Sequence, residues 1–365
     1  MWLTLDDSLL GIDPSEAKTR ASLEPLLTAV GKGEHVLVGR PTVSRHLLQT
    51  ELSPFPRTVL RQVLDMAPDL LAGLEKTNFR VRIVADGRGP CRVAAAEWTI
   101  PLDWFRIHGV PTNSVLGENT RDAELFRVSA VHHQALNRSG LEIRLDVTSG
   151  GGADTPRVLA TEIAGQRRFV LCVTDSDQSC PTAPKSRMNK ECSSIVEGSN
   201  WVAIHFSLEE REMENLLPRN LVQDVITNLS PSDFDARYAD LDAISRKNPA
   251  SWAYLDLKDG TSLTFAFGLC GPFWEEFIDH LPCRESCKKD CLAQRRCMAT
   301  SRADCRCLLA PSLGHRIVDH VRDHLSACSP HASAKRCSTS ANAQGWLKVG
   351  ALVEEWGAAM PKIRS

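Results

Sequence analysis

The chain has 365 residues, of which 42% are hydrophobic, with a formal net charge of −2. Such a composition is typical of a globular protein with one large core or several smaller ones. The balanced charge excludes a surface that is basic overall, so contact with nucleic acid would require a local patch. No apolar run approaches the roughly 20 residues that span a bilayer, and Asp6 and Asp7 interrupt the region where a secretion signal would begin. We therefore expect a cytoplasmic protein with no membrane partner.

Residues 1–112 are expected to form a helical segment followed by a β-hairpin. Leucines and valines recur at helical spacing up to about residue 75. From Phe79 to Ile83 apolar residues alternate with arginines, and a second extended run covers residues 92–100. The Asp-Gly and Gly-Pro pairs between these two runs are typical of a turn.

Short apolar runs alternate with helical patterns over residues 114–206, which predicts an α/β fold with a parallel sheet flanked by helices. The expected strands are Val115–Glu118, Leu141–Val147, Phe169–Asp175 and Trp201–Phe206. The expected helices are Asp122–Leu136, Thr155–Ile163 and Pro184–Val196. We assign residues 113–270 to this sheet domain.

The remaining segment, residues 271–365, is expected to be rich in cysteine and mainly helical. Just before it, Trp252–Lys258 and Thr261–Phe267 flank an Asp-Gly pair, which predicts a hairpin. Residues 329–343 are rich in Ser, Ala, His and Asn, which favours a loop.

Acidic residues follow two of the expected parallel strands. Asp175 and Asp177 come directly after an apolar run, and Glu118 and Asp122 follow the first strand in the same way. Because adjacent parallel strands end at one edge of a sheet, the four carboxylates are expected to converge there. Clustered carboxylates repel one another unless a cation neutralises them, and Mg²⁺ prefers oxygen ligands. The alternative is that Asp122 complements a helix N-terminus and that Asp175 and Asp177 belong to a turn.

A charged segment follows the last of these strands. Glu212 and Glu214 lie in it, although Ser207 and Glu210 have the spacing of a capping box, which favours a solvated helix. Lys258, beside the Asp-Gly pair, is a candidate for holding a phosphate, or it is simply an exposed lysine.

Four segments in this order resemble the motifs of TOPRIM domains in OLD-type nucleases. They are residues 117–126 (GENTRDAELF), 174–177 (TDSD), 211–216 (REMENL) and 255–258 (LDLK). The resemblance covers roughly residues 113–260. It implies a metal-dependent nuclease site made of Glu118, Asp122, Asp175, Asp177, Glu214 and Lys258, with Glu212 as a further metal ligand, and Mg²⁺ or Mn²⁺ as the cofactor.

The chain departs from that family in two respects. OLD proteins carry an ATPase, but no phosphate-binding loop occurs here, so control by ATP would come from a partner protein in trans. TOPRIM domains also occur in topoisomerases. However, only Tyr238 and Tyr254 are available as nucleophiles, and neither lies in a recognisable nucleophile domain.

Six of the thirteen cysteines fall within 25 residues, and without a secretion signal all are expected to be reduced. They are Cys283, Cys287, Cys291, Cys297, Cys305 and Cys307. Four of them could bind one structural Zn²⁺, or they could be thiols packed into a core. The same segment has seven basic and three acidic residues. Either it contacts phosphates through Lys288, Lys289, Arg295 and Arg296, or it is a solvated helix face.

Two functions from different classes follow. The first is a metal-dependent nuclease acting on DNA, or on RNA as the less favoured substrate, in a setting such as defence against phage. The second is a non-catalytic nucleic-acid-binding module of TOPRIM and zinc type that acts in recombination or repair.

Overall fold

The computed structural model describes residues 1–229, 232–277, 289–296 and 307–363. The chain forms two compact units, and each is described by itself. Unit 1 consists of Met1–Val173, Glu191–Phe206 and Val349–Ser365, and unit 2 of Thr174–Lys190 and Ser207–Lys348. Since both units contain separate stretches of the chain, the three consecutive domains expected from the sequence stay a prediction.

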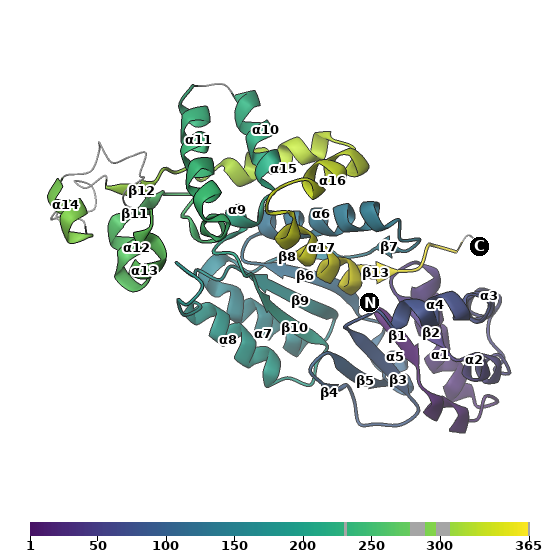
Figure 1. Ribbon diagram of the computed structural model, residues 1–365. Coiled ribbons are helices and arrows are strands. Elements are labelled where there is room, and N and C mark those ends of the chain that lie inside the picture. Colours follow the sequence, from purple (N-terminus) through teal and green to yellow (C-terminus); the bar gives the residue numbers. More distant parts are fainter. Residues whose placement is uncertain (230–231, 278–288, 297–306, 364–365) are drawn as a thin grey trace. The chain divides into compact units, whose positions relative to one another are not determined.

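Unit 1 contains a five-stranded sheet with the strand order β2-β1-β3-β5-β4 (Figure 1). Its strands are β1 (Trp2–Leu5), β2 (Val36–Gly39), β3 (Arg80–Val84), β4 (Cys91–Ala94) and β5 (Glu97–Pro101). The pairs β1–β2, β1–β3 and β3–β5 are parallel, and β4 is antiparallel to β5. The helices of this part are η1 (Asp7–Gly11), α1 (Ala17–Gly31), α2 (Pro41–Leu47), α3 (Pro54–Asp65), α4 (Ala67–Leu74) and α5 (Leu102–His108).

The prediction of N-terminal helices followed by one hairpin was wrong in two respects. The strands β1 and β2 were missed because each has only four residues, and β2 is buried throughout and shows no alternation. The run at residues 92–100 is itself the hairpin, β4 followed by β5. The chain returns through β5 between β4 and β3, so β5 runs in the same direction as β3.

A second sheet has the order β10-β9-β6-β8 and confirms the α/β class. Its strands are β6 (Thr112–Gly117), β8 (Asp146–Ser149), β9 (Arg168–Thr174) and β10 (Ala203–Ser207). β6 pairs in parallel with both β8 and β9, with Leu116 opposite Cys172. The strand β9, which precedes Asp175, lies between β6 and β10 (Figure 1).

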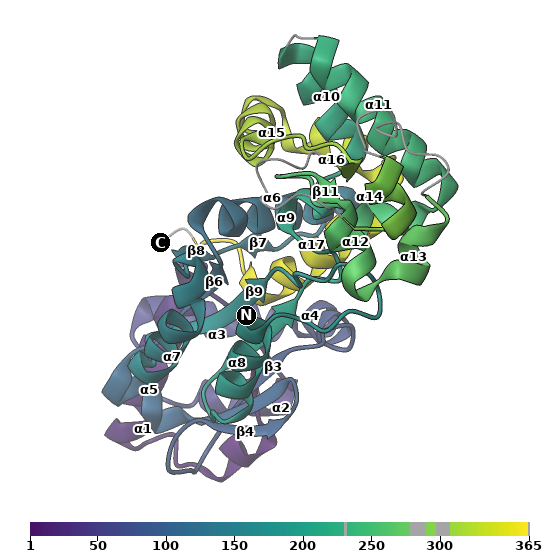
Figure 2. The ribbon, with the colours of Figure 1, turned by 90° about the vertical axis from the view of Figure 1, so that its left-hand side faces the viewer.

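Three helices connect these strands, at the positions that the sequence predicts. They are α6 (Thr120–Asn137), α7 (Thr155–Gly165), which follows the short η2 (Gly152–Asp154), and α8 (Arg187–Glu197). α7 and α8 lie on one face of the sheet and α6 on the other (Figure 1 and Figure 2). The prediction of a single strand at Leu141–Val147 was wrong. Two short strands form there: β7 (Glu142–Ile143) pairs with β13 (Ala358–Ala359), and only β8 joins the four-stranded sheet.

The described part of unit 2 is mainly helical. Its elements are α9 (Met213–Leu216), α10 (Arg219–Leu229), α11 (Ser232–Lys247), η3 (Pro249–Tyr254), β11 (Thr261–Ser262), α12 (Leu263–Leu269), α13 (Gly271–Glu275), α14 (Lys289–Gln294), β12 (Leu308–Ala310), α15 (Ile317–Ala327), α16 (Pro330–Ser338) and the start of α17 (Ala343–Gly357). None of the helices in the described part of the chain combines the length and the hydropathy that crossing a bilayer requires.

Two local predictions in this unit were wrong. No hairpin forms about Gly260, because Pro249 begins the helix η3 and Ser262 caps α12, so β11 pairs instead with the distant β12. The expected loop at residues 329–343 is largely the helix α16, whose first turn is capped by the Ser329 hydroxyl accepting from the Ala332 N–H.

Candidate active site

In unit 2, the loop after β9 places Asp175 and Asp177 in different environments. Asp175 is 6% exposed, whereas Asp177 is exposed and has a left-handed backbone with φ of 56°. This conformation is rare for residues other than glycine. The Asp177 N–H donates to the Arg211 carbonyl at 2.9 Å, and the Ser176 hydroxyl donates to the Glu210 carbonyl at 2.7 Å. The acidic loop is therefore tied to the segment that carries Glu212.

Asn189 of α8 fixes the other side of this loop. Its amide Nδ2 donates to the Asp175 carbonyl at 2.5 Å, and its Oδ1 accepts from the Thr174 hydroxyl at 3.0 Å. Asn189 is 2% exposed, so these bonds do not compete with water.

We expect Asn189→Ala to lower the free energy of unfolding by about 2–3 kcal/mol, because the variant leaves buried polar partners unsatisfied. Chemical denaturation measures this change. The exposed Asn137, which also donates from its amide, is the control, and Asn137→Ala should cost less than about 1 kcal/mol. Equal effects of the two substitutions would contradict a special role of Asn189.

Glu212 and Glu214 are brought to the same region by the helix α9. Glu212 is its N-cap residue, and the Glu212 N–H donates to Asn215 Oδ1 at 3.1 Å. Asn215 also donates to the carbonyls of Trp252 and Leu255 at 2.7 and 2.9 Å. The helix thus begins at Met213, so the capping box expected at Ser207 and Glu210 was wrong. The Asn215 contacts hold the two glutamates against the segment that contains Lys258.

Lys258 lies at the centre of this acidic group. Its ammonium is 3.2 Å from Glu214 Oε2 and 3.5 Å from Glu212 Oε2. Burial acts to lower the pKa of Lys258, but the charges of Glu214, Glu212 and Asp175 outweigh it and raise this pKa well above its ordinary value. Asp175, Glu212, Glu214 and Lys258 therefore interact electrostatically within unit 2.

The two glutamates are buried more deeply than ordinary acidic side chains. Glu212 is 8% and Glu214 3% exposed, and the Oε2 atom of each faces the Lys258 ammonium. Burial raises the pKa of Glu212, although the charges of Lys258 and Arg211 oppose the rise. Buried carboxylates with a single shared ammonium partner fit the ligand set of a hard divalent cation.

Arg211 is a member of this group that sequence reasoning did not assign. Its guanidinium pairs with Glu212 at 3.3 Å and with Asp256 at 3.4 Å, and it lies 4.3 Å from the centroid of the Phe265 ring. Arg211 belongs to the REMENL segment, which was the signal that could have identified it. Asn189 had no comparable signal, because nothing in its local sequence marks it.

Glu118 and Asp122 belong to unit 1, where β6 and α6 position them. The Asn119 side chain caps α6 by accepting from the Asp122 N–H at 3.1 Å, and its amide donates to Asp122 Oδ2 at 2.5 Å. A Cβ on Gly117 would lie 2.8 Å from the Ala123 nitrogen, so this tight connection requires glycine. Asp122 thus takes part in the helix N-terminus, and the convergence of Glu118 and Asp122 with Asp175 stays a prediction.

Half of the ten expected zinc and phosphate residues fall outside the described residues. These are Cys283, Cys287, Cys297, Cys305 and Lys288. The remaining cysteines of that set, Cys291 and Cys307, are buried. Lys289 belongs to α14, Arg296 is exposed, and Arg295 forms an ion pair with Glu275.

The expectation that all cysteines are reduced was wrong for one pair. Cys180 and Cys270 form a disulfide, with their Cα atoms 6.0 Å apart. This separation is within the usual range for disulfides. Because the two residues are 90 positions apart in the chain, no local spacing indicated the pairing.

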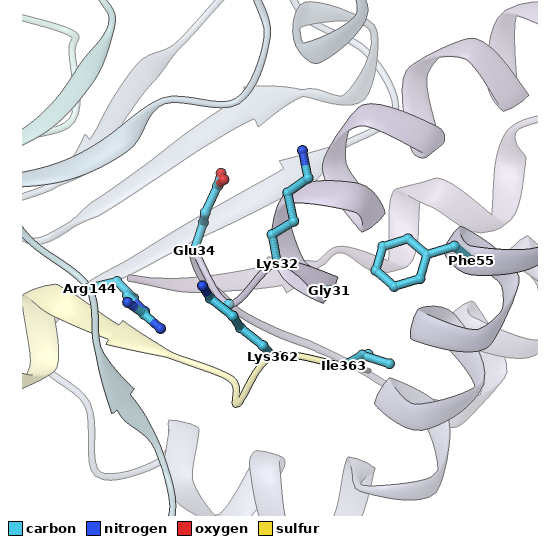
Figure 3. A pocket seen from close by; sticks show the side chains of 8 residues that line it. Gly31, Lys32, Glu34, Phe55, Arg144, Lys362 and Ile363 are labelled. Atoms are coloured by element: carbon cyan, nitrogen blue, oxygen red, sulfur yellow. The ribbon is translucent and has the colours of Figure 1, made fainter. Parts of the chain in front are cut away.

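A separate hollow in unit 1 is lined by basic side chains and contains none of the predicted acidic residues. Figure 3 shows Lys32, Arg144 and Lys362 around it together with Glu34. All three basic residues are exposed, and Arg144 pairs with Glu142 at 2.7 Å. Exposed and partly paired side chains of this kind do not define a ligand site.

Comparisons of the chain with models of protein families, with curated proteins and with solved structures found no match. The assignment of a function therefore depends on the residues of the two units.

Proposed function

We propose that the protein is a nuclease of TOPRIM type that uses a divalent cation, Mg²⁺ or Mn²⁺, to hydrolyse phosphodiester bonds in DNA. The observation that carries the proposal is the buried acidic group of unit 2, in which Asp175, Glu212 and Glu214 surround Lys258. A group of buried carboxylates is costly to a fold unless a cation neutralises it. Lys258 and Arg211 supply two positive charges for four carboxylates, which are Asp175, Glu212, Glu214 and Asp256.

The topology of unit 1 supports the inclusion of Glu118 and Asp122. β6 and β9 are parallel neighbours, with Leu116 opposite Cys172. Glu118 follows β6 two residues after Leu116. In α/β sheets, ligands bind at the carboxyl ends of such strands.

Each residue has a role in the proposed site. Asp175, Asp177, Glu212 and Glu214 of unit 2 would hold the metal, and the resemblance to TOPRIM domains implies the same role for Glu118 and Asp122. When bound, the metal would activate a water molecule and neutralise the charge that develops on the phosphate. Lys258, whose side chain is 33% exposed, would contact a phosphate oxygen. Arg211 would keep Glu212 ionised and oriented through their ion pair.

The test is incubation of the purified protein with plasmid DNA, linear DNA and RNA in Mg²⁺, Mn²⁺ or EDTA. The proposal predicts cleavage of DNA that depends on the metal and stops in EDTA. Binding of DNA without cleavage in any metal would contradict it and favour the non-catalytic module. Cleavage that persists in EDTA would also contradict it.

A further inference from the structure

A group of metal-ligating side chains in unit 1 lies outside the acidic group of unit 2 and the cysteine-rich segment, although the charge of Glu118 acts on its two thiols. It consists of Cys172, Cys192 and His205. Their sulfur and nitrogen atoms all lie within 4.8 Å of one another. Both thiols are fully buried, and the imidazole is half-buried. Among the described residues, this is the one group of three or more His, Cys, Asp or Glu residues whose ligand atoms meet in this way.

The local fold explains why these three residues meet. Cys172 lies on β9 and His205 on the neighbouring strand β10, and α8 connects the two strands and carries Cys192. Cys192 and Val196 are one helical turn apart on the buried side of α8. The helix therefore directs the Cys192 thiol toward the two strands.

A hydrogen bond orients the imidazole. His205 Nδ1 lies 2.9 Å from the Ser193 hydroxyl. Histidines that bind a metal through one ring nitrogen usually have a polar partner at the other, which fixes the ring orientation and the tautomer. In a zinc complex through Nε2, Ser193 would have this role.

Two thiols and one imidazole are the donors that Zn²⁺ selects, in contrast to the oxygen ligands that suit Mg²⁺. With a Zn–S distance of about 2.3 Å, two sulfurs in a tetrahedral site are roughly 3.8 Å apart. Because the ligand atoms already lie within 4.8 Å of one another, side-chain adjustments of about 1 Å or less would complete the geometry. Two thiolates would also balance the charge of the ion in this buried position.

We propose that Cys172, Cys192 and His205 bind one Zn²⁺ ion, with a water molecule in the fourth coordination position. Binding releases the two thiol protons to solvent. The ion links α8 to β9 and β10 and so stabilises the strand that leads to Asp175. The proposal rests neither on the nuclease proposal nor on any zinc bound between Cys283 and Cys307.

The test is the zinc content of the full chain after purification without chelators, combined with the absorption spectrum after exchange to Co²⁺. All variants carry Cys283→Ser and Cys287→Ser, so that the cysteine-rich segment contributes less to the metal content. Cys192→Ser and His205→Gln are the test variants. The control is Cys91→Ser, because Cys91 is an exposed, free thiol of the same unit.

The background protein carries only Cys283→Ser and Cys287→Ser. We expect about one zinc per chain in this protein and in the Cys91→Ser control. Both test variants should lose at least about 10-fold in zinc affinity. The thiolate-to-Co²⁺ band should weaken in Cys192→Ser but remain in the control. Circular dichroism should show that the variants are folded. Zinc content that is unchanged in both test variants, or absent from the background protein, would overturn the proposal. A Cys172–Cys192 disulfide found by mass spectrometry of the unreduced protein would overturn it as well.

Discussion

Replacing Asp175 by Asn is expected to lower metal-dependent cleavage by about 100-fold or more, which corresponds to roughly 2.7 kcal/mol of transition-state stabilisation. The substitution keeps the volume of the side chain and removes one negative charge. The metal then loses one negatively charged ligand. Asp175 is only 6% exposed, so water replaces this ligand poorly. Without metal, the free energy of unfolding should stay within about 1 kcal/mol of the wild type or rise, because one charge is removed from a cluster of carboxylates.

Cleavage rates and melting temperatures measured on the same preparations decide this prediction. Asp69→Asn is the control, since Asp69 is exposed on α4, and it should leave both quantities unchanged. If Asp175 were only a turn residue, its replacement would lower the melting temperature and leave cleavage intact. A destabilised but active Asp175→Asn protein would therefore refute the assignment.

Replacing Lys258 by Met is expected to lower the free energy of unfolding by about 1–3 kcal/mol at neutral pH. The variant leaves Glu212 and Glu214 buried without their shared counter-charge. Breaking a fully buried pair costs about 3–5 kcal/mol, but Lys258 is one-third exposed, and solvent screening reduces the effect.

The loss should depend on pH in a defined direction. The pKa of Glu212 is already raised above its value of 4.5 in the unfolded chain, and removal of Lys258 raises it further. A carboxyl group with a raised pKa in the folded state destabilises the fold as pH rises from 4.5 through that raised pKa. Urea denaturation at several pH values should therefore show the largest loss at neutral pH and a smaller one near pH 4.5.

Lys348→Met is the matched control for this experiment. Lys348 also pairs with a glutamate, Glu209, but both side chains are more than half exposed. Its replacement should cost less than about 1 kcal/mol at every pH. If Lys258→Met behaves like this control, the claim that Lys258 neutralises the buried glutamates Glu212 and Glu214 is wrong.

Hydrophobic patterning was sufficient to predict the four-stranded sheet around β9 but not the five-stranded sheet formed by β1–β5. Phe169–Thr174 is a continuous apolar run with helical patterns on both sides, so β9 and its neighbours were predictable. β1 and β2 are too short to show a period, and the pairing of β1 with β2 and with β3 joins residues distant in sequence. The same reason explains the missed pairing of β11 with β12.

The candidate site was predictable in its residue types but not in its internal contacts. Motif order identified Glu212, Glu214 and Lys258, whereas their grouping depends on the Asn215 amide, which bonds two carbonyls about 40 positions away. The Cys172, Cys192 and His205 group had no sequence signal. Its members are 20 and 13 positions apart, and only the packing of α8 on two strands brings them together.

The binding of Mn²⁺ to the purified chain tests most directly the claim that these carboxylates form a metal site. The free-ion signal in electron paramagnetic resonance measures binding, and Mg²⁺ serves as the competitor. We predict that the wild type and Asp69→Asn bind Mn²⁺, that Mg²⁺ displaces it, and that Asp175→Asn binds at least about 10-fold more weakly. If the wild type binds no Mn²⁺, or if Asp175→Asn binds it equally well, the carboxylates are not a metal site.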